Sequence, residues 1–294
     1  MLIDLKYHLI SLVAVFLALA VGIVVGSSFI AGSSVKGLEK EFVKLRADNR
    51  LQQNKIDDMK AQINRHLQFD RAVAPFLADK QLSGRRIAII QTGDYSEAAQ
   101  SARAILETAG AKVASVTTLS NLNSESARNR VVRAAEVITG ETPLDPAARL
   151  IEIVANCIAT GSNPNALGIL EEKGLLTASG GYDRKVLRVV LIGGSRYSAS
   201  DRASHIDLPL IDALTNAGVV TIVGAEPLNA VTSYVAAYHR KAISTVDNVD
   251  QPMGQVALVY AMAGETGSFG VKRSADRVVP VYLESGQWRT QSQR

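Results

Sequence analysis

The chain has 294 residues, 47% hydrophobic and 20% charged, and its 32 basic and 28 acidic side chains leave a formal net charge of +4. An excess this small, spread along the sequence, argues against a nucleic-acid partner. The single cysteine, Cys157, excludes an internal disulfide framework, and its place in a helical apolar pattern favours a role in the core.

The first predicted element is a transmembrane anchor over residues 1–34, because residues 9–30 carry no charged side chain. A helix needs about 20 mostly apolar residues to cross the hydrocarbon core. A cleaved signal peptide would have a shorter apolar core and a more basic start than Lys6 alone provides. Lysines and arginines are more numerous after the run than before it, so the positive-inside rule would place the following residues in the cytoplasm.

A coiled coil is predicted over residues 35–70, where apolar residues recur at alternating spacings of four and three. Asn49 at a core position favours a parallel homodimer in register, because a buried Asn pairs best with its own copy. The alternative is a single solvated helix that lies on its own globular domain. The predicted dimerisation residues are Leu38, Phe42, Leu45, Asn49, Ile56, Met59 and Ile63.

Residues 71–84 are predicted to form a hinge, because Pro75 should end the helix. The rest of the chain, residues 85–294, alternates apolar runs with helical patterns, as a parallel α/β sheet does. We therefore predict a Rossmann-like three-layer α/β domain with a helical insertion between its second and third strands. The predicted strands are residues 85–91, 112–118, 185–192, 219–223 and 242–246, with 278–283 as an edge strand at best, given Pro280.

Helical spacing predicts the other elements of this domain. Ser96 and Asp207 are each placed to cap a helix at its N-terminus. The predicted helices of the insertion are residues 126–139, 145–160 and 165–176, and a last helix spans 253–263.

Ligands of open α/β sheets bind at the carboxyl ends of the strands. The polar residues expected there, and hence a possible ligand cleft, are Asp94, Ser195, Glu226, Asp247 and Asp250. No dinucleotide, phosphate-loop, nucleophile-elbow or zinc-protease motif accompanies them. We therefore predict no catalytic residues, no cofactor and no metal ligands. Asp247 and Asp250 are more simply explained as turn residues that satisfy their own backbone.

Two segments resemble the signature sequences of the actinobacterial MctB/SteB family. The first is the N-terminal Asp4-Leu5-Lys6-Tyr7-His8 before the apolar span, where the family usually has arginine in place of Lys6. The second is Thr245–Asp250 with the later Gly254 and Gly270, although Ser268-Phe269-Gly270 departs from the aromatic-glycine ending of the family. The resemblance covers the whole layout and implies that the globular domain lies outside the cytoplasmic membrane, against the lysine count.

The resemblance implies two functions. One is a non-enzymatic, single-pass scaffold that acts in cell separation with a SteA-like partner and influences peptidoglycan hydrolases. The other is copper transport or resistance, although one helix per chain cannot enclose a pore. A third, enzymatic interpretation would place a nucleotide or sugar in the strand-end cleft. The anchor, the coiled coil and the missing motifs favour the first.

Overall fold

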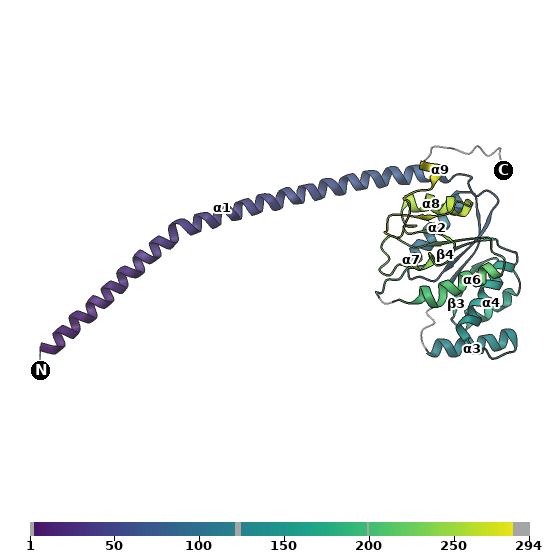
Figure 1. The fold of residues 1–294 in the computed structure, drawn as a ribbon, viewed down its shortest axis with the longest axis horizontal. Helices are drawn as coiled ribbons and strands as arrows, with labels where there is room; N and C mark the ends of the chain where they lie inside the picture. The colour runs from purple at the N-terminus through teal and green to yellow at the C-terminus, as the bar shows by residue number, and fades with distance from the viewer. Residues whose placement is uncertain (1–2, 121–124, 199, 285–294) are drawn as a thin grey trace. The chain divides into compact units, whose positions relative to one another are not determined.

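The computed structural model describes residues 3–120, 125–198 and 200–284, and the chain divides into two compact units, Met1–His66 and Leu67–Arg294. Figure 1 labels the main elements. The helices are α1 (Ile3–Ala78), α2 (Ser96–Thr108), α3 (Glu125–Thr139), α4 (Pro146–Thr160), α5 (Pro164–Glu172), a π-helix (Ala203–Asp207), α6 (Leu208–Asn216), α7 (Val235–Tyr238), α8 (Pro252–Ala263) and α9 (Val281–Glu284). The strands are β1 (Arg86–Gln91), β2 (Lys112–Leu119), β3 (Leu176–Gly180), β4 (Arg188–Ile192), β5 (Thr221–Ala225), β6 (Ser244–Val246) and β7 (Ser268–Phe269).

The predicted apolar helix is part of α1. Its segment Leu5–Ser27 has a mean hydropathy of 2.9 and no residue buried by the chain itself. In the described part of the chain it is the one helix that is long and apolar enough to cross a membrane. One N-terminal helix of this kind indicates a single-pass membrane protein.

The prediction that Pro75 ends the helix is wrong. Helix α1 runs through Pro75 to Ala78, and the second compact unit begins at Leu67, not after a hinge over residues 71–84. Packing explains the difference, because Ala74 and Ala78 are buried. Ala74 packs with Tyr260 of α8, whose hydroxyl donates to the carbonyl of Leu77 at 3.3 Å. These contacts hold the last turn of α1 despite the N–H that proline lacks.

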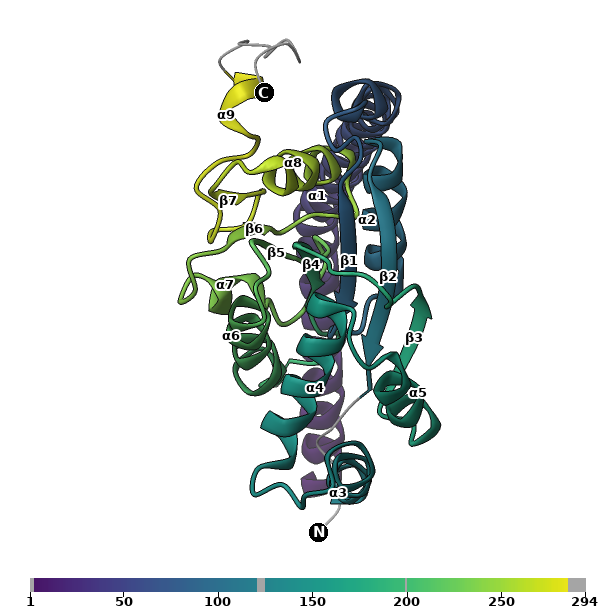
Figure 2. The ribbon, with the colours of Figure 1, turned by 90° about the vertical axis from the view of Figure 1, so that its right-hand side faces the viewer.

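The sheet of the second unit has seven strands in the order β3-β2-β1-β4-β5-β6-β7, which can be followed across Figure 2. All neighbours pair in parallel except β2 and β3. The five predicted strands are confirmed as β1, β2, β4, β5 and β6. Counted among themselves, these five strands have the 2-1-3-4-5 order of doubly wound sheets. In this order, successive strands are added on one side of β1 and then, from β4 onwards, on its other side. The numerals of the full sheet also begin 3-2-1-4-5-6, but β3 is antiparallel, so the sheet lacks the third parallel strand that dinucleotide-binding sheets have on this side.

Helices cover both faces of this sheet, because the strands are apolar on both sides (Figures 1 and 2). Along β1, Ala88 and Ile90 belong to a core with α4 and α6, whereas Ile87 and Ile89 belong to a second core with α2 and α8. The sheet therefore forms the middle of three layers.

The helical insertion is confirmed as α3, α4 and α5, but its end differs from the prediction. Helix α5 stops at Glu172, and Leu176–Gly180 forms the antiparallel edge strand β3. The outer side of β3 is partly closed, because the backbone N–H of Ala178 donates to the carboxylate of Glu171 at 3.2 Å.

The other edge of the sheet also differs from the prediction. Residues 278–283 do not form a strand, since Val281–Glu284 is the short helix α9. The edge strand is instead Ser268–Phe269, and its outer side is bonded by Arg277, whose N–H donates to the carbonyl of Ser268 at 3.2 Å.

Candidate functional site at the carboxyl edge of the sheet

The loops after β1 and β4 meet where the strand order reverses. A Cβ atom on Gly93 would lie 2.4 Å from the carbonyl oxygens of both Gly193 and Gly194, so only glycine allows this approach. The backbone N–H of Asp94 donates to Gly194 O at 3.0 Å. The Ser195 hydroxyl then donates to Asp94 Oδ2 at 2.6 Å, which joins two of the five predicted cleft residues.

The loop after β5 is organised by Glu226, whose side chain is fully buried. Its Oε1 accepts from the Ser233 hydroxyl and from Lys272 Nζ, each at 2.6 Å. Its Oε2 accepts from the backbone N–H groups of Tyr234 and Val235, at 2.6 and 3.2 Å. Four donors, one of them the positively charged Lys272, satisfy this carboxylate, as a buried charge requires.

Asp247 holds the loop after β7 in place by accepting hydrogen bonds from its backbone. Its Oδ1 accepts from the N–H of Val271 at 2.9 Å and its Oδ2 from the N–H of Lys272 at 2.8 Å. A Cβ on Gly270 would lie 2.0 Å from Asp247 Oδ1, at a backbone φ of +143° that favours glycine. The partners of Asp247 are therefore in a distant loop and not in its own turn.

Asp250 and Asn248 complete the Thr245–Asp250 segment. Asp250 Oδ1 accepts from the N–H of Leu228 at 2.7 Å, again in another loop. Gly254, on the first turn of α8, lets the backbone pass close to Asn248, since a Cβ there would lie 2.1 Å from Asn248 O. The segment Thr245–Asp250, one of the two that resemble the family, thus uses its acidic residues to connect neighbouring loops.

The role of Asp207, a buried acid next to these loops, differs from the prediction. Asp207 was predicted to cap a helix, but its side chain makes no capping hydrogen bond. It is fully buried and accepts a short hydrogen bond from the Tyr238 hydroxyl. Burial raises the pKa of Asp207 from 3.8 to about 7, and the Tyr238 hydrogen bond opposes that rise. Ser96 also lacks the predicted capping role, since Tyr95 is the N-cap residue of α2.

Arg202 contacts the loop after β1, and its positive charge lowers the pKa of Asp207, against the larger effect of burial. Its guanidinium is 3.6 Å from Asp94 Oδ1 and donates to the carbonyl of Leu119 at 3.2 Å. The side chain is almost fully buried, and sequence reasoning gave it no role. No motif in the sequence singles out Arg202, and the π-helix that follows it, a feature that recurs at functional sites, is visible only in the structure.

The five predicted cleft residues therefore lie at one edge, as the topology requires, but their oxygens serve the protein's own loops. Ser195 has Asp94 and the N–H of Tyr197 as partners. The histidines of the globular unit contact other groups: His205 is bonded to Asp201 and His239 to Ser268. These contacts do not place a histidine base next to the Ser195 hydroxyl, as a nucleophile, base and acid arrangement would require.

Donors for a soft metal are also dispersed. Among the residues that the structure describes, no group of three or more His, Cys, Asp and Glu is placed to hold a metal ion. Cys157 is buried in α4, and burial raises the pKa of its thiol to about 11. Since the thiolate is the form that binds metals, this cysteine is a poor Cu(I) ligand at neutral pH.

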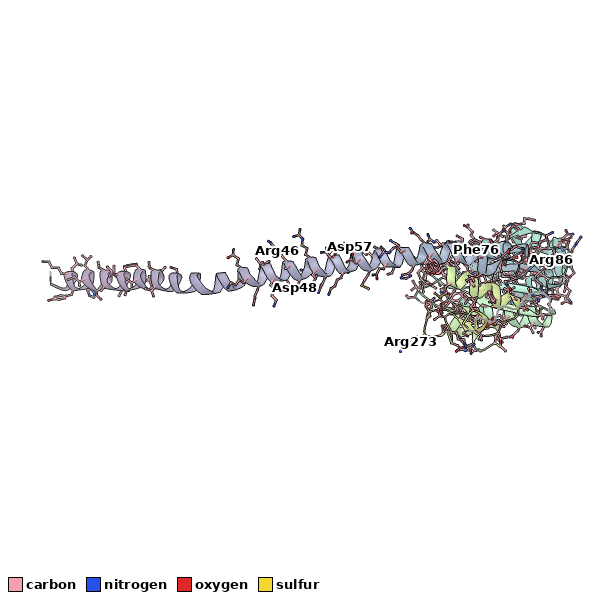
Figure 3. The ribbon with its side chains drawn as sticks, turned by 90° about the horizontal axis from the view of Figure 1, so that it is seen from above. Arg46, Asp48, Asp57, Phe76, Arg86 and Arg273 are labelled. Atoms are coloured by element: carbon pink, nitrogen blue, oxygen red, sulfur yellow. The ribbon has the colours of Figure 1, made fainter. Side chains whose placement is uncertain are left out.

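The predicted dimerisation residues lie on α1 in the first unit. The side chain of Leu38 falls outside the described residues. Asn49 is exposed, and Figure 3 labels its neighbours Arg46 and Asp48 on the same helix. The apolar members are between 45% and 61% exposed within this single chain: Phe42, Leu45, Ile56, Met59 and Ile63.

Fold and site together define an α/β protein with a single N-terminal membrane-type helix and internally satisfied strand-end carboxylates. A family profile described as "Copper transport outer membrane protein, MctB" matches residues 2–280. The chain belongs to the MctB family, as the sequence resemblance indicated. It is similar to the "Copper transporter MctB" of Mycobacterium tuberculosis (strain ATCC 25618 / H37Rv) and of Mycobacterium bovis. Each is 24% identical over 308 aligned residues, which cover 93% of this chain and 98% of the relative.

Proposed function

We propose that this chain is a non-enzymatic, homodimeric scaffold of the cell envelope that acts in cell separation. In this proposal α1 anchors the chain in the cell membrane, and the α/β unit lies outside the cytoplasm. A SteA-like protein and a peptidoglycan hydrolase, or a regulator of one, would be its partners, as the resemblance implies.

The exposed apolar stripe of α1 is the observation that carries the proposal. We call the predicted dimerisation residues on α1 its seam. Large apolar side chains at heptad spacing gain free energy when a second helix covers them, at roughly 25 cal/mol per Å². No element of the described chain covers Phe42, Leu45, Ile56, Met59 or Ile63. The carboxylates of Glu226 and Asp247 bond to donors of the protein's own loops, which supports the non-enzymatic part of the proposal.

The dimer is tested by the mass of the full chain in detergent, measured by light scattering with the detergent contribution subtracted. We expect a dimer for the natural sequence. Asn49→Leu should keep the chain associated but shift its state or register, because the buried Asn is what specifies two parallel strands. Asn54→Leu, the same substitution on the opposite face of the helix, is the matched control and should leave the mass unchanged. A natural chain that stays monomeric at high concentration would contradict the proposal.

Copper transport is the second candidate, favoured by the description of the family and by the names of the relatives. Copper would then be the cargo. The decisive measurement is competition for Cu(I) between the full chain and bathocuproine disulfonate under reducing conditions. The scaffold proposal expects no submicromolar, stoichiometric binding, and Cys157→Ser should behave like the natural chain. Stoichiometric binding below micromolar would replace the scaffold by the copper function.

A further inference from the structure

Four large apolar side chains are exposed on the loops that follow β4, β5 and β7, at the carboxyl edge of the sheet. We call them the apolar rim: Tyr197, Leu228, Val231 and Val271, with exposed fractions of 73%, 41%, 62% and 53%. Exposed apolar groups that come from several loops at one edge mark interaction sites more often than scattered ones do. Tyrosine in particular is enriched where interfaces concentrate their binding energy.

The backbone of the rim is fixed on the β4 and β5 side by Ser195. The Ser195 hydroxyl accepts from the N–H of Tyr197 at 3.1 Å, and the Ser195 carbonyl accepts from the N–H of Val231 at 2.9 Å. The hydroxyl of Thr232 donates to the carbonyl of Tyr197 at 2.5 Å, which ties the two loops to each other.

Carboxylates fix the other two members. Asp250 accepts from the N–H of Leu228, and Asp247 accepts from the N–H of Val271. Lys272 Nζ donates to the carbonyl of Pro227 at 3.1 Å and so connects the β7 loop to the β5 loop. Three of the five residues of the predicted ligand cleft, Ser195, Asp247 and Asp250, therefore hold rim residues in place through a side-chain oxygen. A surface ordered in advance loses less conformational entropy when a partner binds.

Unpaired positive charge lies at the Val271 end of the rim. Arg273 and Arg277 are exposed, and neither forms an ion pair with another described side chain; Figure 3 labels Arg273 on the globular unit. At the Tyr197 end, by contrast, Arg196 is already paired with Glu97 at 2.5 Å and stacked on the Tyr95 ring at 4.4 Å. The free guanidinium groups suit carboxylates, to which arginine donates in a bidentate way.

We propose that the apolar rim is a docking surface for a protein partner that presents apolar side chains flanked by carboxylates. The surface lies in the globular unit and shares no residue with the seam of α1. It can therefore be tested apart from the dimer, and its failure would leave the result for Asn49→Leu unaffected.

The experiment is selection of a random 12-residue phage-displayed library on the full chain in nanodiscs, with the Tyr197→Ser chain as the counter-selection. Enriched peptides should combine Leu, Ile or Phe with Asp or Glu. The best peptide, synthesised and measured by fluorescence anisotropy, should bind at least tenfold more weakly to Tyr197→Ser. It should bind several-fold more weakly to Arg273→Glu, and weaken with added salt. Val220→Ser, which alters a 75% exposed valine next to the amino end of β5, is the matched control and should bind like the natural chain.

Three results would overturn the proposal. The first is equal binding by the natural and Tyr197→Ser chains, or no enrichment over the counter-selection. The second is enrichment of basic or uncharged peptides, which would refute the partner's chemistry. The third is self-association of the natural chain that Tyr197→Ser abolishes, since the occupant would then be a second copy. Near-ultraviolet circular dichroism of each variant confirms that its fold is retained.

Discussion

Replacing Gly254 by alanine should destabilise the globular unit by about 1–3 kcal/mol, although alanine is the better helix former by about 1 kcal/mol. The added Cβ would lie 2.1 Å from Asn248 O and 2.4 Å from Asn248 Oδ1. Helix α8 and the loop after β6 must then separate. That movement would disturb the buried face of α8, which packs against the sheet. Urea unfolding of the full chain in detergent, followed by near-ultraviolet circular dichroism, measures the change.

Gly168→Ala is the matched control, because Gly168 is also a helical glycine, in α5, but has no atom within 4 Å of the added Cβ. This change should stabilise the chain by about 0.5–1 kcal/mol through helix propensity alone. Opposite signs for the two glycines are the expected outcome. If Gly254→Ala also stabilised the chain, the close packing of α8 on Asn248 would be wrong.

The stability of the globular unit should fall as the pH rises from about 4 to 7, through the titration of Asp207. Burial raises its pKa from 3.8 to about 7, so the folded chain keeps a proton that the unfolded chain releases. The stabilisation from the protonated form is complete below about pH 4 and is lost as the pH passes 7. Its upper limit is on the order of 4 kcal/mol, at about 1.4 kcal/mol for each unit of pKa difference.

Asp207→Asn should remove this dependence, because the amide is neutral at every pH. The free energy of unfolding of the natural chain, relative to the variant, should therefore decrease between pH 4.5 and pH 8. Tyr238→Phe removes the hydrogen bond that favours the carboxylate, so the folded pKa rises and the decrease should continue to higher pH. Parallel pH profiles for the natural chain and Asp207→Asn would show that Asp207 does not titrate in this range.

Local sequence patterns were sufficient to predict the strands that are buried on both faces of the sheet. The run 87–90 reads as a parallel strand because every one of its residues is apolar, and the structure buries all of them. Long-range packing decided the exceptions. Residues 176–180 carry a weak strand pattern and become β3 only through pairing with β2. Pro75 remains helical only because α8 covers the preceding alanine.

The candidate site, too, was predictable where topology decides and unpredictable where long-range contacts decide. The position of the five polar residues at one edge followed from strand topology, and the structure places them there. Their partners could not be predicted, since Asp247 bonds to residues 24 and 25 positions away, and Asp250 to one 22 positions away. The sequence predicts a cap at Asp207 because it shows neither the burial of this residue nor its contact with Tyr238, 31 residues further on. The pairing of the α1 seam stays a prediction.

The treatment of the two sheet edges bears on how the protein survives at high local density in a membrane. An open edge strand offers its N–H and C=O groups to any other strand and so invites aggregation. Here the N–H of Ala178 on one edge is occupied by Glu171, and the other edge is bonded by Arg277. Two copies of the chain are thereby discouraged from joining their sheets edge to edge. Association is left to side chains, whose pairing can be specific and reversible.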